Sequence, residues 1–230
     1  LSWLAAIPNA TSGAATVMLE TIDTSGASLG SYSYGFTIAA PSSVVPTISS
    51  VSASPVNDNS VISGWGIYVY GKSKAKLTIN GAAGAYGSTI RSYSITTSPN
   101  VGSASSASYT TGLLYSSGTI TVTAKITDSR GRTATKTTAF SVYAYSAPYF
   151  SSVESYRCNS SGTRDDVNGT YARILATFGR STLNGSNNVS CRLVMTQIGG
   201  SYSTSATLTS GTAVILGGAV SYTHLRAHET

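Results

Sequence analysis

The chain has 230 residues, and only 10% of them are charged. Its 14 basic and 8 acidic residues give a formal net charge of +6, but the basic residues are scattered, which argues against a nucleic-acid-binding stripe. No apolar run has the length of a membrane span and no signal peptide is visible, although Leu1 is not a methionine and we expect a fragment of a longer protein.

The expected fold class is all-β, because short stretches rich in β-branched and aromatic residues alternate with turn residues. Residues 1–45 are interpreted as the last strands of a first module followed by a linker. Strands are expected at 16–22 and 31–38, on either side of a turn at 23–26. Two prolines bracket the linker, which predicts a short, semi-rigid joint.

Residues 46–146 are expected to form a complete antiparallel sandwich of about seven strands. Three runs of alternating residues mark inward faces: Trp65, Ile67 and Val69; Ala75, Leu77 and Ile79; and Ile120, Val122, Ala124 and Ile126. Further strands are expected at 90–96, 108–114 and 132–142.

Residues 147–219 are predicted to be a truncated third β-module, with strands at 171–178, 189–198 and 206–208. We expect one or two strands to be missing, which leaves an unpaired edge. Cys158 and Cys191 are the chain's two cysteines. Free, buried thiols are the favoured interpretation, and a disulfide between neighbouring strands is the alternative.

A sequence repeat supports this division. Pro46–Val51 returns as Pro148–Val153, an offset of 148 − 46 = 102 residues. A second pair, ending at Asp23 and Asp128, is offset by 128 − 23 = 105 residues. A period of this length fits one small β-domain rather than a solenoid unit, so tandem modules are predicted.

Three lysines are the first candidate binding residues. Lys72, Lys74 and Lys76 share one parity, which predicts three cations on one face of a strand. Protection of an edge strand is the favoured interpretation. The alternative is weak attraction to an anionic cell-wall polymer.

The motif Asp128-Ser129-Arg130-Gly131-Arg132 predicts a hairpin turn, with the aspartate bonded to nearby amides and the glycine at positive φ. We expect the turn to be solvated. Contact of Arg130 and Arg132 with an acidic partner is the alternative.

The stretch Asp165-Asp166-Val167-Asn168-Gly169 carries clustered oxygens that hint at calcium, but an EF-hand alternation is absent and a loop turn is favoured. Asn57-Asp58-Asn59 is a weaker candidate. Tyrosines suggest either a sugar-stacking platform or ordinary surface filling, which we favour: Tyr68, Tyr70, Tyr86, Tyr143 and Tyr145. No catalytic residue, metal site or cofactor is expected.

Residues 220–230 resemble the translation of transposase adapter DNA used in sequencing libraries, so we interpret them as an assembly artefact. Both histidines of the chain, His224 and His228, lie there. Histidine-based catalytic triads and metal sites are therefore excluded from the remaining sequence.

Four segments resemble the repeated Ig-like region of minor structural proteins from tailed phages of Gram-positive hosts: Gly71–Ile79, Ala83–Ile90, Thr119–Lys136 and Tyr156–Thr163. The resemblance covers roughly residues 1–198. It implies a component of the virion tail or tail tip made of tandem Ig-like sandwiches, and it supplies no catalytic residues.

The leading hypothesis is therefore a non-enzymatic virion protein, assembled in the bacterial cytoplasm, whose modules act as spacers or weak adhesive units. Other tail proteins are the expected partners, with host cell-wall glycan or anionic polymer as a further one, and neither nucleic acid nor a membrane span is expected. A bacterial surface adhesin and accessory modules of a cell-wall hydrolase are the alternatives, since sandwiches serve all three.

Overall fold

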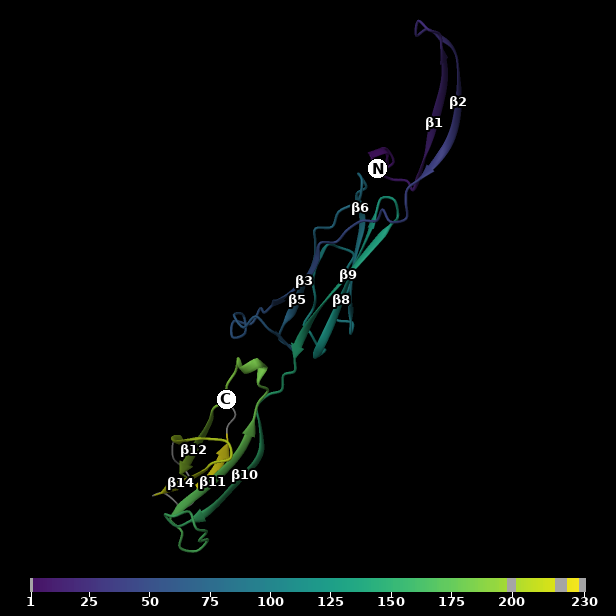
Figure 1. Ribbon diagram of the computed structural model, residues 1–230. Helices are drawn as coiled ribbons and strands as arrows, with labels where there is room; N and C mark the ends of the chain where they lie inside the picture. The colour runs from purple at the N-terminus through teal and green to yellow at the C-terminus, as the bar shows by residue number, and fades with distance from the viewer. Residues whose placement is uncertain (1, 198–201, 218–222, 228–230) are drawn as a thin grey trace. The chain divides into compact units, whose positions relative to one another are not determined.

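The computed structural model describes residues 2–197, 202–217 and 223–227 (Figure 1). The described chain is nearly all β, as predicted, and divides into two compact units, Leu1–Tyr143 and Ala144–Thr230. No helix in the described ranges is long and apolar enough to cross a membrane. The elements are η1 (Ser2–Ala6), β1 (Ser12–Ile22), β2 (Ser28–Ala39), β3 (Ser50–Val56), β4 (Tyr68–Val69), β5 (Lys74–Asn80), β6 (Ile90–Ser98), β7 (Ser108–Thr110), β8 (Gly118–Asp128), β9 (Thr133–Tyr143), β10 (Tyr149–Cys158), β11 (Tyr171–Gly179), η2 (Leu183–Gly185), β12 (Cys191–Gln197), β13 (Tyr202–Leu208), β14 (Ala213–Gly217) and β15 (Thr223–Ala227).

In the first unit the short helix η1 is followed by a hairpin, β1–β2, that forms a two-stranded sheet. The predicted turn joins its strands. Asp23 Oδ1 accepts hydrogen bonds from the backbone N–H groups of Ser25 and Ala27, both at 2.8 Å, and Gly26 has a φ of 88°. The Ser25 hydroxyl, which donates to the same oxygen, and the Ala27 N–H lower the pKa of Asp23.

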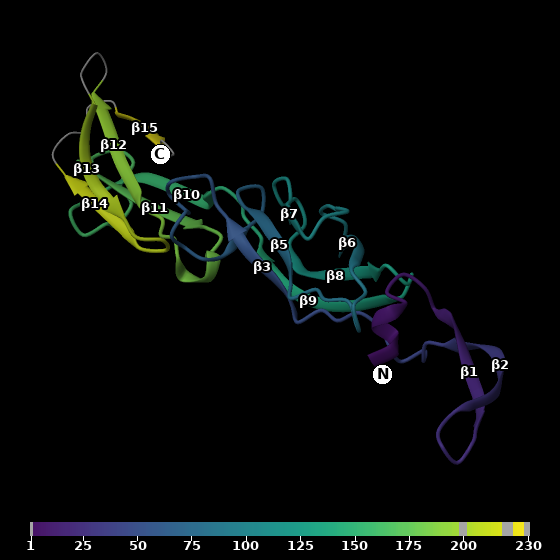
Figure 2. The ribbon, with the colours of Figure 1, turned by 90° about the horizontal axis from the view of Figure 1, so that it is seen from above.

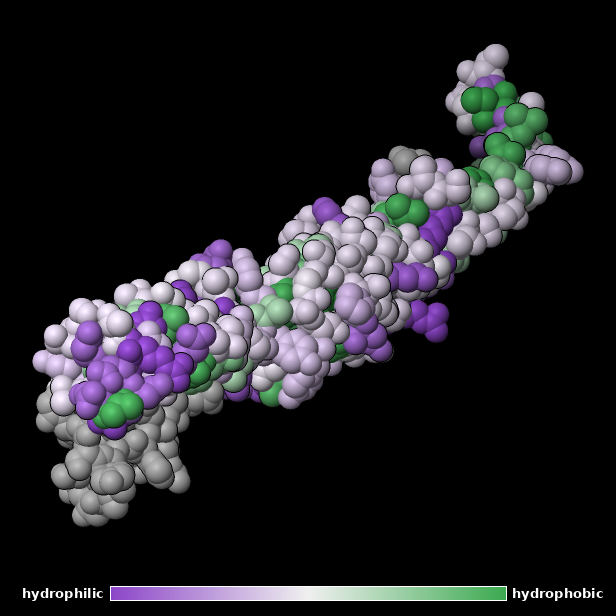
Figure 3. Space-filling view, turned by 90° about the horizontal axis from the view of Figure 1, so that it is seen from below, coloured by the Kyte–Doolittle hydropathy of each residue, from purple (hydrophilic) through white to green (hydrophobic). Residues whose placement is uncertain are grey.

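One face of this hairpin is apolar and exposed. Val17 lies opposite Tyr34, and Leu19 lies opposite Tyr32. Leu19 is 73% exposed and Tyr32 is 70% exposed. The hairpin appears as a band of hydrophobic residues in the space-filling view (Figure 3). An isolated two-stranded hairpin is only marginally stable in water, so this ribbon lacks the packing that stabilises the rest of the unit.

The rest of the first unit is a seven-stranded sandwich, β3 to β9, in agreement with the predicted number (Figures 1 and 2). One sheet has the order β3-β5-β7 and the other has the order β4-β9-β8-β6. The pairs are antiparallel except for β4 and β9, which run parallel. The core contains the inward residues predicted on β5 and β8, together with side chains from neighbouring strands: Val51, Tyr68, Ala75, Leu77, Ile79, Ile95, Leu114, Ile120, Val122, Ala124, Ile126, Phe140 and Val142.

Two expectations for this sandwich are wrong. Trp65 and Ile67 lie in a loop, and only Tyr68–Val69 is strand there. The loop is held by Asn57, whose side-chain N–H group donates to backbone carbonyls at 3.1 and 3.2 Å across it. The strand expected at 108–114 ends at Thr110. Alternation alone does not reveal such local hydrogen bonds.

Hydroxyl groups cover much of the outer face of the sheet β4-β9-β8-β6. Thr121 and Thr123 of β8 point away from the core, which receives the alternate residues of that strand. Thr123 lies between Thr96 of β6 and Thr137 of β9. This face therefore presents cross-strand rows of polar, uncharged side chains.

The second unit contains two three-stranded sheets, β10-β11-β14 and β13-β12-β15. Apolar residues from both sheets form its core: Ala172, Ile174, Ala176, Cys191, Leu193 and Leu208. Strand β12 pairs with β13 on one side and with β15 on the other. Strand β15 belongs to the segment interpreted as adapter sequence, so that segment occupies an edge where a missing strand was expected. Ile198 and residues 218–222 and 228–230 lie outside the described residues, and the origin of the segment stays a prediction.

Candidate functional site

The three candidate lysines do not share one strand face. Lys74 and Lys76 lie on β5, whereas Lys72 lies in the turn before it. Strand β5 is the central strand of its sheet, paired with both β3 and β7, so the interpretation as edge protection is wrong. Lys74 forms an ion pair with the exposed Asp58, an interaction that contributes little stability at a surface. The side chains of Lys72 and Lys76 are exposed, whereas that of Lys74 is half-buried.

The turn after β8 contains a fully buried carboxylate. Asp128 is 0% exposed. Its Oδ1 accepts the backbone N–H groups of Arg130 at 3.0 Å and Arg132 at 2.9 Å, and its Oδ2 accepts the hydroxyl of Ser88 at 3.1 Å. Gly131 has a φ of 78°, as the turn prediction requires. The turn itself is therefore confirmed.

Arg130 is buried, and the expectation that it is solvated is wrong. It is 6% exposed, and its guanidinium donates four hydrogen bonds to backbone carbonyls. Nη2 donates to Leu4 and Tyr86, both at 2.8 Å, Nη1 donates to Ala85 at 2.5 Å, and Nε donates to Ile7 at 3.2 Å. Two of these carbonyls belong to the sandwich and two belong to the segment before β1.

Arg132 contacts the segment after β2 in the same way. Its guanidinium donates to the carbonyls of Ala40 at 2.8 Å and Val44 at 2.6 Å, and also to that of Pro41. Together the two arginines occupy seven backbone acceptors. The planar fork of an arginine suits such multiple acceptors better than the point charge of a lysine.

A small apolar cluster accompanies these polar contacts. Leu4, Ala40 and Val44 are buried in it, with Trp3, Ile7 and Ala85 packed against them. The hydroxyl of Ser129 adds a hydrogen bond to the carbonyl of Pro8 at 2.7 Å. Residues from both sides of the hairpin β1–β2 therefore meet the loop and the turn at one end of the sandwich.

The chain contains the same turn without arginines. Asp23 accepts the N–H groups two and four residues later, as Asp128 does. Ser25 and Ala27 stand where the second turn has Arg130 and Arg132. The turn at Asp23 is exposed and has no such carbonyl contacts, so the turn geometry does not depend on the arginines.

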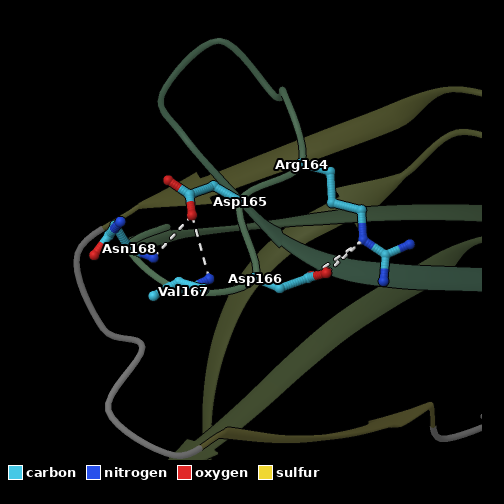
Figure 4. Close-up of polar contacts among 5 residues, drawn as sticks. All are labelled: Arg164, Asp165, Asp166, Val167 and Asn168. Carbon is cyan, nitrogen blue, oxygen red and sulfur yellow. Dashed lines mark hydrogen bonds and ion pairs between the residues drawn. The ribbon is translucent and has the colours of Figure 1, made fainter.

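The stretch at residues 165–169 is a turn, as favoured (Figure 4). Asp165 Oδ1 accepts the backbone N–H groups of Val167 at 3.2 Å and Asn168 at 2.8 Å. Asp166 pairs with Arg164 at 2.9 Å. The two carboxylates thus bond within the loop, and the part of the chain that the structure describes holds no group of three or more potential metal ligands.

Tyr68 is buried and packs on Phe140, with ring centroids 4.3 Å apart. Burial raises its pKa to about 12. It therefore lies in the core and not on a surface platform. Tyr70 contacts Tyr115 edge to face at 5.8 Å, and both rings are exposed. Tyr86, Tyr143 and Tyr145 also have exposed side chains.

Both cysteines are buried free thiols, as favoured. Burial raises the pKa of Cys191, which lowers its thiolate fraction at neutral pH. We expect both thiols of the native chain to react with a thiol-specific disulfide reagent at least about 100-fold more slowly than a free thiol. In urea, two thiols per chain should react with the reagent without added reductant. Fast reaction of the native chain, or fewer than two equivalents in urea that reductant restores, would contradict this prediction.

Residues 1–168 match a protein family described as siphovirus protein of unknown function (DUF859). No protein in a search of the curated proteins matches the chain.

Proposed function

The chain belongs to this siphovirus family, and we propose that it is a non-enzymatic structural protein of the virion tail or tail tip. Its hosts would be Gram-positive bacteria, and it would be assembled in their cytoplasm with other tail proteins. In this proposal the β-modules act as spacers that hold other parts of the tail at a defined separation.

The strand order of the complete module supports an Ig-like assignment. Sheets β3-β5-β7 and β4-β9-β8-β6 correspond to strands A-B-E and A′-G-F-C of an Ig-like sandwich, with the short parallel pair β4–β9 at the A′–G position. Sandwiches of this kind commonly serve as passive spacers, although the fold alone does not select a function.

The observation that carries the proposal is the internal repeat. Hairpin β1–β2 has the turn of hairpin β8–β9, and Ile22 pairs with Ser28 as Thr127 pairs with Thr133, although a bulge then shifts the register of β1–β2 by one residue. Residues from the start of the chain therefore repeat the last two strands of the complete sandwich. Val17 and Leu19 stand where Val122 and Ala124 face the sandwich core. Tandem modules multiply length and copy number, which suits an extended structural role.

Weak attachment to the host surface is a second part of the proposal. Lys76 is exposed on the outer face of β5, with Lys72 and Lys74 nearby in the chain. An anionic cell-wall polymer or glycan would be the partner. Several copies per virion would compensate for weak single contacts. Arg130 and Arg132 are not part of this proposed contact, because their guanidinium groups already donate to carbonyls of their own chain.

Immuno-gold labelling of purified virions with antibodies against residues 46–143 tests the proposal. Labelling at the tail, together with recovery of the chain by mass spectrometry of gradient-purified particles, is expected. Absence from virions and labelling of the bacterial wall instead would support an adhesin and overturn the proposal. Lysis of host cell walls by the full-length protein would support the hydrolase alternative and would equally overturn it.

A further inference from the structure

We propose that residues 129–132 and the loop at 83–88 form a socket that binds the backbone of the preceding module and fixes it to the sandwich. The bound partner is polypeptide backbone: residues 2–8 before β1 and residues 40–44 after β2. The inference does not rest on the assignment to a virion, since it concerns only how adjacent modules are joined.

The contacts converge on carbonyl groups from both ends of the hairpin. Ser129, Arg130 and Arg132 together donate six hydrogen bonds to these two stretches, residues 2–8 and 40–44, which we call the leading segment. The acceptors are the carbonyls of Leu4, Ile7, Pro8, Ala40, Pro41 and Val44. Hydrogen bonds from a charged donor are about twice as strong as neutral ones. Because these acceptors are main-chain atoms, the socket does not require particular side chains at those positions.

The loop at 83–88 supplies the other wall of the socket. Tyr86 has a φ of 48°, a left-handed conformation that is costly for a residue other than glycine. This conformation accompanies the placement of the Ala85 and Tyr86 carbonyls on Arg130. A Cβ added to Gly84 would lie 2.0 Å from the carbonyl oxygen of Ser88, so the loop requires a glycine there.

Burial distinguishes this joint from a flexible linker. Pro46 lies among the fully buried side chains, and Val44 belongs to the small apolar cluster. The N–H of Thr47 donates to the carbonyl of Ala83 at 2.8 Å, so the chain is bonded to the loop directly after the linker. A linker held by main-chain bonds, apolar burial and two guanidinium groups transmits orientation from one module to the next.

The exposed turn provides the variant that tests the socket. The double substitution R130S and R132A gives the second turn the residues found at Ser25 and Ala27 in the first, whose geometry forms without arginines. Hydrogen exchange of the full chain should then accelerate about ten-fold or more at four amides that bond to carbonyls around the hairpin: those of Ile7, Ala10, Ala40 and Val44. Exchange in β5 and β8 should stay unchanged.

A matched control removes two exposed basic residues of the same sandwich, Arg91→Ser and Lys125→Ala, and should leave every segment as in the natural sequence. Arg130→Lys keeps the charge but loses the planar fork of the guanidinium. Its exchange rates are therefore expected to lie between those of the control and those of the double variant. Unchanged exchange in the leading segment of the double variant would overturn the proposal. Equal acceleration in β5 and β8 would also overturn it, because the arginines would then stabilise the sandwich itself.

Discussion

Asp128→Ala is expected to destabilise the first unit by on the order of 3 kcal/mol, because about 1–3 kcal/mol is lost for each buried donor left without an acceptor. The buried carboxylate accepts three hydrogen bonds, from the Ser88 hydroxyl and from the N–H groups of Arg130 and Arg132. Alanine provides no acceptor, and the fully buried position is closed to bulk solvent.

Urea unfolding followed by tryptophan fluorescence measures this loss, because both tryptophans, Trp3 and Trp65, lie in the first unit. Asp23→Ala is the matched control. It removes the same carboxylate from the same turn at a half-buried position whose turn neighbours are exposed, and the fluorescence midpoint should barely move. Equal shifts for the two variants would mean that burial of Asp128 contributes nothing beyond the turn.

Leu77→Ala is expected to destabilise the same unit by about 2–5 kcal/mol. The side chain is fully buried on the central strand β5, and it contributes to the core between the two sheets of the sandwich. Truncation removes apolar burial and leaves a cavity, which the surrounding strands, paired on both sides, do not readily close.

Lys76→Ala on the neighbouring position of β5 is the control for this prediction, because that side chain is exposed. Its effect should remain within about 0.5 kcal/mol. The two variants are compared by the same fluorescence measurement. A Leu77→Ala midpoint close to that of Lys76→Ala would show that the sandwich core is not packed as the structure describes.

Much of the sandwich follows from local sequence pattern. The alternation from Ile120 to Ile126 predicts an inward face, and all four of its apolar residues lie in the core. The turn at Asp128 is equally readable, because an aspartate and a glycine at this spacing favour it. Trp65 fits the same alternation but lies in a loop, since the Asn57 side chain and the glycines around it decide that conformation.

No comparable pattern in the local sequence predicts the socket. Arg130 bonds to Leu4, which is 126 residues away in the sequence, and the acceptor is a main-chain carbonyl that every residue possesses. The exposed turn at Asp23 and the buried turn at Asp128 have similar sequences, so the local sequence does not predict which one is buried. Because arginine side chains are mostly exposed in proteins, a solvated arginine is the expectation. Only the difference between the two copies of the turn, arginines in one and none in the other, marks the position as unusual.

The hydroxyl rows of Thr96, Thr123 and Thr137 have a consequence for the behaviour of the protein in solution. Added salt screens interactions between charges, and it has little effect on contacts between water and uncharged hydroxyl groups. With only 10% of its residues charged, this chain is kept hydrated largely by groups that do not respond to ionic strength. These hydroxyl rows on the sheet β4-β9-β8-β6 should therefore stay equally hydrated in dilute buffer and in concentrated salt.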